Sequence, residues 1–151
     1  MHRIGVISDT HGQLDPRVHA AFAGVDLIVH AGDIGHMVIE ELETIAPVVA
    51  VLGNNDTWDF DLPLEERFEV EGVSFLAVHE PRHIRPPVAD VTIHGHTHVA
   101  EVERTAEGLR VNPGSPARPR GAKGRSVAII EVEDRRVVSA RILELDSLPD
   151  Q

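Results

Sequence analysis

The sequence predicts an α/β fold with α+β character in its second half. Apolar runs of strand length recur along the 151 residues, and in the first half they alternate with amphipathic segments. Alternation of strand and helix favours a parallel sheet with right-handed crossovers. In the second half, polar and apolar residues alternate, as in RVVSARILEL, a pattern typical of antiparallel strands.

Each predicted element follows from a local pattern. Strands are expected over residues 4–7, 27–29, 48–52, 73–78, 91–93, 127–132 and 137–143. A helix is expected from Pro16 to about Ala23, because Asp15 before Pro16 is typical of a cap followed by proline in the first helical position. A second helix is expected over 37–45. Turn residues at 107–108 and 112–114 separate later strands.

Composition limits the class of protein. The chain is long enough for one core, so we expect a single domain over residues 1–151. Its 14 basic and 25 acidic residues give a net charge of -11, which argues against general binding to nucleic acids and against binding to anionic membranes. The sequence shows no signal or membrane segment, so a cytoplasmic protein is expected, and a homo-oligomer stays open.

Polar side chains follow five of the predicted strands. In open α/β sheets, ligands bind beyond the carboxyl ends of the strands. The residues delivered there are Asp9, His11, Asp33, Asn54, His79, His96 and His98. A single Asp or His at a strand end is more often a cap or a packing residue, but so many imidazoles together indicate a site.

The chemistry of these side chains indicates metal binding. The chain has no Cys, so metal ligands must be His, carboxylates and amides. Seven such ligands exceed the roughly four of a structural zinc site and suit two ions that share a carboxylate. We therefore predict two divalent ions, with Mn²⁺ the first choice and Fe, Zn²⁺ or Ni²⁺ as alternatives.

The order of these motifs resembles a known family. SDTHG, HAGD, GNND, His79 and GHTH, with NPGSPARPR after them, are similar to the motifs of calcineurin-like metallophosphoesterases, in particular their small single-domain prokaryotic phosphodiesterases. The resemblance covers residues 4–120. A match to one short motif is weak, whereas five in order are specific.

The resemblance implies a fold, a metal site and a reaction. The family fold is a four-layer αββα sandwich. One metal would be bound by Asp9, His11 and His98, and the other by Asn54, His79 and His96, with Asp33 bridging the two. A bridging hydroxide would attack phosphorus in line while both ions stabilise the developing charge.

The sequence departs from the family at two places. The family often has a proton-donating His after the ligand Asn, but here that residue is Asn55, which donates hydrogen bonds and cannot act as a general acid. We therefore expect leaving groups of low pKa to be preferred, unless His36 substitutes as the acid. Asp33, Asn54 and Asn55 are the predicted catalytic residues. The second departure is HEPRH from His79 onward, where Glu80 and Arg82 would alter the pocket wall.

Other basic residues receive structural interpretations. His30 and His94 are expected to pack or to orient ligands, and His2 and His19 to lie on the surface. Arg120 would either bind a substrate phosphate or anchor its loop by an ion pair. The basic stretch 117–125 is expected to be a solvated loop.

The prediction for function is a metal-dependent phosphodiesterase acting on a small phosphate ester. Two alternatives remain open: a phosphomonoesterase or nucleotidase that uses the same metals, and a non-catalytic protein-binding scaffold of the same fold. The complete set of ligands favours an enzyme, whereas an exposed apolar patch would favour the scaffold.

Overall fold

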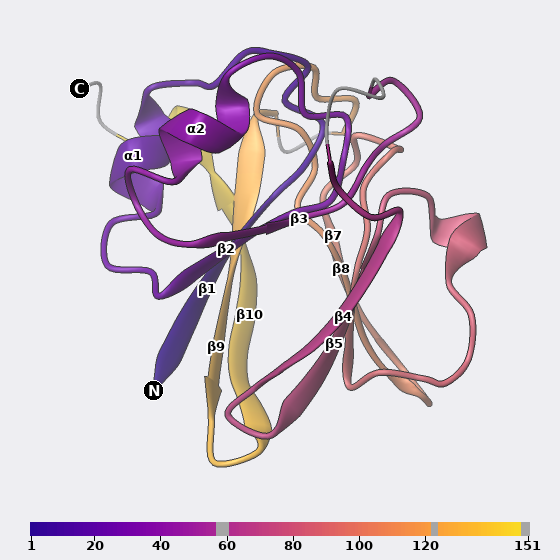
Figure 1. Ribbon diagram of the computed structural model, residues 1–151. Helices are drawn as coiled ribbons and strands as arrows, with labels where there is room; N and C mark the ends of the chain where they lie inside the picture. The colour runs from indigo at the N-terminus through magenta and orange to yellow at the C-terminus, as the bar shows by residue number, and fades with distance from the viewer. Residues whose placement is uncertain (57–60, 122–123, 149–151) are drawn as a thin grey trace.

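Two five-stranded sheets pack face to face in the computed structural model, which describes residues 1–56, 61–121 and 124–148 (Figure 1). The first sheet has the order β10-β9-β1-β2-β3, formed by β1 (His2–Ile7), β2 (Leu27–His30), β3 (Val48–Ala50), β9 (Ser126–Glu133) and β10 (Arg136–Glu144). The second has the order β4-β5-β6-β8-β7, formed by β4 (Glu65–Val70), β5 (Val73–Val78), β6 (Val91–Ile93), β7 (Glu101–Thr105) and β8 (Gly108–Asn112).

Both sheets are mixed. β1, β2 and β3 pair in parallel, and β9 and β10 add an antiparallel hairpin to them. The hairpins β7–β8 and β9–β10 confirm the antiparallel prediction for the second half. The prediction is wrong for the pairing of β8 with β6, which is parallel. After β6 the chain returns along β7, so β8 runs in the same direction as β6. The carboxyl ends of the parallel strands in each sheet therefore lie at one edge.

The helices are short and lie outside the first sheet (Figure 1). α1 (Arg17–Ala21) begins one residue later than predicted: Pro16 is the N-cap, and the Asp15 carboxylate accepts the backbone N–H of Arg17 at 2.9 Å. α2 (Val38–Leu42) is followed by turns over 43–45. None of the described helices has the length and apolar character needed to cross a membrane.

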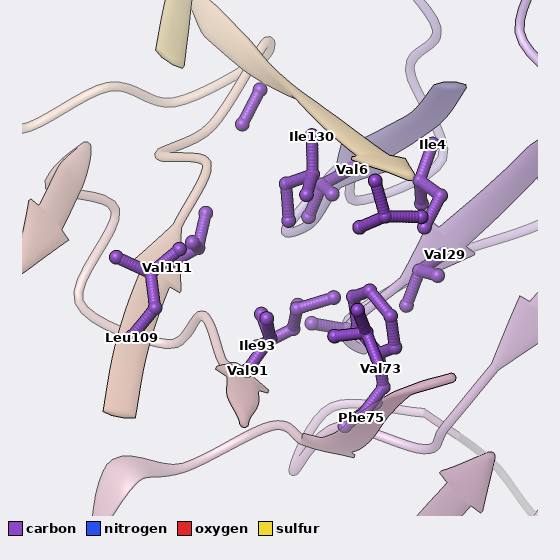
Figure 2. Packing of buried hydrophobic residues seen from close by; sticks show 14 of the residues in the cluster. Ile4, Val6, Val29, Val73, Phe75, Val91, Ile93, Leu109, Val111 and Ile130 are labelled. Carbon is purple, nitrogen blue, oxygen red and sulfur yellow. The ribbon is translucent and has the colours of Figure 1, made fainter. Parts of the chain in front are cut away.

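The main core fills the space between the sheets. Ile4, Val6 and Ile130 of the first sheet face Phe75 and Ile93 of the second (Figure 2). The opposite face of the first sheet buries Ile7 and Ile28 against the helices. Because β1 is buried on both faces, its side chains are almost continuously apolar, as the sequence pattern predicted.

The outer layer over the second sheet is thin. A 3-10 turn, η1 (Pro81–His83), precedes a loop whose Ile84 and Ala89 pack on Leu76 and Val78. A second 3-10 turn, η2 (Leu145–Ser147), closes the chain near α1. The predicted α/β sandwich is confirmed. Within the described residues, its fourth layer consists only of η1 and the loop that follows it.

Candidate metal centre

The predicted ligands converge from both sheets. Asp9 and His11 follow β1, Asp33 follows β2 and Asn54 follows β3, all in the first sheet. His79 follows β5, and His96 and His98 follow β6, in the second sheet. The site therefore lies where the carboxyl-terminal edges of the two sheets meet.

Strained backbone is concentrated at these residues. Positive φ angles occur at Asp9 (57°), His11 (49°), Asp33 (56°), His96 (73°) and His98 (63°). Such angles are uncommon outside glycine and each costs on the order of 1–3 kcal/mol. Five of the nine described non-glycine residues with positive φ are thus predicted ligands, as is typical of a functional site.

Asp9 lies at the centre of the cluster and is fully buried. Its Oδ2 accepts the Ser8 hydroxyl at 2.7 Å and the His96 backbone N–H at 3.0 Å. Within the described residues, its Oδ1 has no hydrogen-bond partner. This oxygen is 3.2 Å from Nε2 of His98, 3.8 Å from Nε2 of His79 and 4.0 Å from Nε2 of His11.

Backbone carbonyls orient two of these imidazoles. His79 Nδ1–H donates to the Ala31 carbonyl at 2.8 Å, and His98 Nδ1–H donates to the Arg118 carbonyl at 2.6 Å. With the proton on Nδ1, each Nε2 presents a lone pair to the cluster. His98 Nε2 also lies 3.3 Å from His11 Nε2, and His79 Nε2 lies 3.3 Å from Nδ1 of His96.

This arrangement fits divalent cations. A buried carboxylate oxygen and several imidazole lone pairs facing one another are unfavourable unless a positive charge lies between them. Two groups have ligand atoms within 4.8 Å of one another, namely Asp9 with His11 and His98, and Asp9 with Asp33 and His79. The first group is the same triad that the resemblance assigned to one metal.

Asp33 belongs to the second group and also approaches His11 of the first. Its Oδ2 is 3.4 Å from His79 Nε2 and 3.9 Å from His11 Nε2. Asn55 holds this carboxylate through two hydrogen bonds: its backbone N–H donates to Oδ1 and its side-chain N–H donates to Oδ2, each at 2.9 Å. Asn55 therefore contacts the predicted bridging ligand directly, a role that the sequence did not suggest.

The electrostatics of the cluster favour ionised Asp33. Burial raises the pKa of Asp33, but hydrogen bonding to His79 and Asn55 more than offsets this, so the pKa lies below its ordinary value. For His79, burial lowers the pKa, but Asp33 and Asp9 outweigh it and the net pKa is raised. The two carboxylates thus favour positive charge at this position.

His11 is affected in the opposite direction. Burial lowers its pKa, Asp33 opposes this effect, and the positive charge of Arg118 lowers the pKa further. The result is a pKa below the ordinary value, so His11 is neutral and can act as a ligand near neutral pH.

Two clefts adjoin the cluster. One, of about 330 Å³, is lined by His11, Asp33, Gly35, Asn55, Asp56 and Arg118. The other, of about 220 Å³, is lined by Asn54, His79 and Glu80 together with Leu52, Gly53, Leu64, Glu65, Val78, His83 and Arg85. Asn54 is exposed, and it shares this second cleft with His79. Glu80, predicted to alter the wall, lies 3.6 Å from Nε2 of His96.

Glycines allow close approach to the carboxylates. A Cβ added to Gly53 would collide with Oδ1 and the backbone nitrogen of Asp33. A Cβ added to Gly95 would collide with the Ser8 hydroxyl and would lie 2.6 Å from Oδ2 of Asp9. Only glycine therefore fits at these two positions without moving a predicted ligand.

The sequence interpretation missed residues that hold the site together. The Asp56 carboxylate accepts three backbone N–H groups, from Asp33 (2.9 Å), Ile34 (2.8 Å) and Gly53 (2.7 Å). It thereby joins the loops after β2 and β3. Its position at the end of GNND, where Asp commonly binds nearby backbone amides, was the available signal.

The remaining histidines lie outside the cluster. His30 is fully buried: Gly32 N–H donates to its Nδ1 at 3.1 Å, and its Nε2–H donates to Thr10 Oγ1 at 3.0 Å. It therefore orients the loops that carry Asp9 and Asp33, without touching either carboxylate. His2 and His19 are exposed and pair with glutamates, as predicted.

Among the other basic residues, the arginine that lines the cleft differs from expectation. His94 is half-buried beside the Gly95 carbonyl. His36 is exposed, and the neighbouring Gly35, not His36, lines the first cleft. Arg118, not the predicted Arg120, lines that cleft. The backbone N–H of Arg120 donates to the His98 carbonyl at 3.0 Å. Residues 122–123 of the basic loop lie outside the described residues.

Comparison with known proteins gives one consistent family. Residues 2–135 match the calcineurin-like phosphoesterase superfamily domain. The chain is 34% identical to a probable metallophosphoesterase of Methanothermobacter thermautotrophicus, over 89% of this chain and 88% of the relative. It is 30% identical to a phosphodiesterase of Methanocaldococcus jannaschii, over 74% of this chain and 82% of the relative.

Solved structures have the same architecture. A structure described as a novel archaeal phosphodiesterase matches with a TM-score of 0.71 and 26% identity, covering 93% of this chain and 99% of that one. Vps29 from Entamoeba histolytica, in complex with Zn²⁺, matches with a TM-score of 0.74 and 20% identity, over 93% and 97%. At that identity, the likeness to Vps29 concerns the fold alone.

Proposed function

Because the chain belongs to the calcineurin-like phosphoesterase superfamily, we propose that it is a metal-dependent phosphodiesterase whose active site is the cluster around Asp9 and Asp33. The observation that carries this proposal is the buried Oδ1 of Asp9, which has no hydrogen-bond partner in the part of the chain that the structure describes and is faced by three imidazole nitrogens within 4.0 Å. Relatives that are named phosphodiesterases support it. We further propose that residues 1–151 form one domain.

The ligand set supports two divalent ions. Asp9, His11 and His98 would hold one ion, and Asn54, His79 and His96 the other, with Asp33 shared by both. When bound, such ions stabilise negative charge on the phosphoryl group and lower the pKa of coordinated water. The mixture of carboxylate, amide and imidazole suits Mn²⁺, Fe or Zn²⁺ better than Mg²⁺ or Ca²⁺ and does not choose among the first three; we take Mn²⁺ as the first candidate, with Fe, Zn²⁺ or Ni²⁺ as alternatives.

The protein itself positions these ligands before metal binds. The Ala31 and Arg118 carbonyls fix the protons of His79 and His98 on Nδ1, which leaves Nε2 free to bind. Asn55 holds Asp33 in its ionised form and in one orientation. These contacts reduce the reorganisation that metal and substrate binding require.

The two clefts favour a diester over a monoester. A diester has two ester arms and one negative charge, whereas a monoester has one arm. Asn54 and Asn55, adjacent in sequence, line different clefts beside the same cluster, so each cleft can receive one arm. The side chain at position 55 is an amide and does not protonate a leaving group. This favours ester arms whose leaving alcohol has a low pKa.

Hydrolysis of two model esters tests the proposal. Protein stripped of metal is assayed on bis-p-nitrophenyl phosphate and p-nitrophenyl phosphate, with Mn²⁺, Zn²⁺, Ni²⁺ or Mg²⁺ restored singly. We expect restored hydrolysis, faster on the diester. Faster hydrolysis of the monoester would instead support the phosphomonoesterase alternative, and inactivity of the metal-loaded protein on both esters would support the scaffold.

A further inference from the structure

Arg118 occupies a fixed place beside the cluster. Its backbone carbonyl accepts Nδ1–H of His98, and its backbone N–H donates to the Ser115 hydroxyl oxygen at 2.8 Å. The same hydroxyl donates to the Asp9 carbonyl at 2.8 Å. The backbone that carries Arg118 is therefore bonded to the loops of two predicted metal ligands, which fixes where its side chain begins.

Arg118 is one of the residues that line the first cleft, and it is exposed there. It lines this cleft with His11, Asp33 and Asn55. A residue with a cationic side chain thus lines the space next to the predicted ligands.

The donors of this guanidinium remain available. Arg17, Arg67 and Arg82 each pair with a carboxylate, at 2.7, 3.1 and 3.2 Å. Across residues 1–56, 61–121 and 124–148, Arg118 makes its hydrogen bonds through backbone atoms. In the same wall, one of the two N–H donors of the Asn55 side-chain amide is already bonded to Asp33.

We propose that Arg118 binds a non-bridging oxygen of the substrate's phosphate group in this cleft. The inference rests on the proposed function, and it names the anionic phosphodiester group as the feature recognised. A guanidinium offers two parallel donors that match phosphate oxygens, and it stays charged at every working pH. It also offsets, locally, the repulsion of an anion by a chain of net charge -11.

Phosphate binding measured by calorimetry tests this role independently of turnover. The probe is inorganic phosphate, titrated into Mn²⁺-loaded wild type, Arg118→Met, Arg118→Lys and the control Arg120→Met. Met keeps the length and apolar stem of Arg118 and leaves its backbone contacts intact. Arg120 is an exposed arginine of the same loop whose side chain does not belong to the cleft lining.

We expect Arg118→Met to bind phosphate roughly tenfold to a hundredfold more weakly, as is typical for the loss of a charge-assisted hydrogen bond. The phosphate affinity of Arg118→Lys should lie between those of wild type and Arg118→Met, and that of Arg120→Met should stay within about twofold of wild type. Bound Mn²⁺, measured by mass spectrometry, should be equal in all four proteins. For esters that the wild type hydrolyses, kcat/KM should fall in the same order.

Three results would overturn the proposal: equal phosphate affinity in Arg118→Met and wild type, an equal loss in Arg120→Met, or loss of Mn²⁺ from Arg118→Met. The last would assign the side chain to the metal centre. If the wild type binds phosphate but hydrolyses no ester, the proposed function fails while the phosphate titrations still decide the role of Arg118.

Discussion

Replacing His30 should remove a large part of the acid sensitivity of folding. Its ring is fully buried and neutral, with Nδ1 accepting from Gly32 and Nε2–H donating to Thr10. Burial, chiefly, and then the nearby His79 lower the pKa of His30 to about 3. Protonation of Nδ1 would break the bond from Gly32 and place a charge in the interior.

The magnitude follows from the difference in pKa between the unfolded and folded states. An unfolded histidine has a pKa of about 6.5, so between pH 6.5 and 3 the unfolded state binds more protons at residue 30 than the folded state does. The contribution of His30 to the free energy of unfolding is therefore fully present above pH 6.5 and decreases as the pH falls toward 3. At pH 5 the loss is about 1.5 pH units times 1.36 kcal/mol, or about 2 kcal/mol.

Urea denaturation followed by circular dichroism, with a chelator present, measures this loss. The free energy of unfolding is compared between pH 8 and pH 5 for wild type, His30→Gln and the exposed control His19→Gln. Because other titrating groups are shared, we expect the pH-dependent loss in His30→Gln to be smaller than in wild type by about 2 kcal/mol. The same pH-dependent loss in His30→Gln and wild type would refute the reasoning, as would an equal reduction in His19→Gln.

Four other substitutions probe the metal centre. Asp33→Ala or His98→Ala should remove bound metal and activity together, as measured by metal content and diester hydrolysis; normal turnover in a metal-replete mutant would contradict the two-metal proposal. Asn55→His should extend activity toward leaving groups of higher pKa, and the account of the missing acid fails if relative rates across an aryl-to-alkyl series match those of wild type. Gly53→Ala should force Asp33 to move and reduce stability by about 1–3 kcal/mol, with weaker Mn²⁺ binding in a titration; unchanged metal affinity would show that Asp33 tolerates the displacement.

Much of the architecture could be predicted because burial leaves a direct mark on the sequence. β5 and β6 have the predicted bounds, since their runs are apolar and end at polar motif residues. The sequence analysis missed β4, β7 and β8. In β4 and β7, EERFEV and EVERT carry charged residues on half-exposed or exposed edge strands, and in β8, GLRVN has only two buried apolar side chains, Leu109 and Val111. The parallel pairing of β6 with β8 depends on a long-range contact that local patterns do not encode.

The site shows the same division. The strand-end pattern predicted one cluster, and the structure places ligand atoms of Asp9, His11, Asp33, His79 and His98 in two groups, each within 4.8 Å; their role as metal ligands stays a prediction. The sequence analysis named Arg120 and not Arg118, because the position of each arginine depends on how their loop is bonded to Asp9 and His98. Likewise, a motif shows which residue occupies position 55, but not that its amide is turned toward Asp33.

The predicted ligands come from two different sheets, so the packing of the core between the sheets sets the distance between the ligands. Asp9 and His11 move with the first sheet, and His79 and His98 with the second. Sheet spacing is set by side-chain volume at contacts such as Val6, Phe75 and Ile93. A methylene gained or lost in these layers would change which ionic radius the cluster accommodates best. Metal preference is therefore a property of the whole sandwich as well as of its ligand atoms.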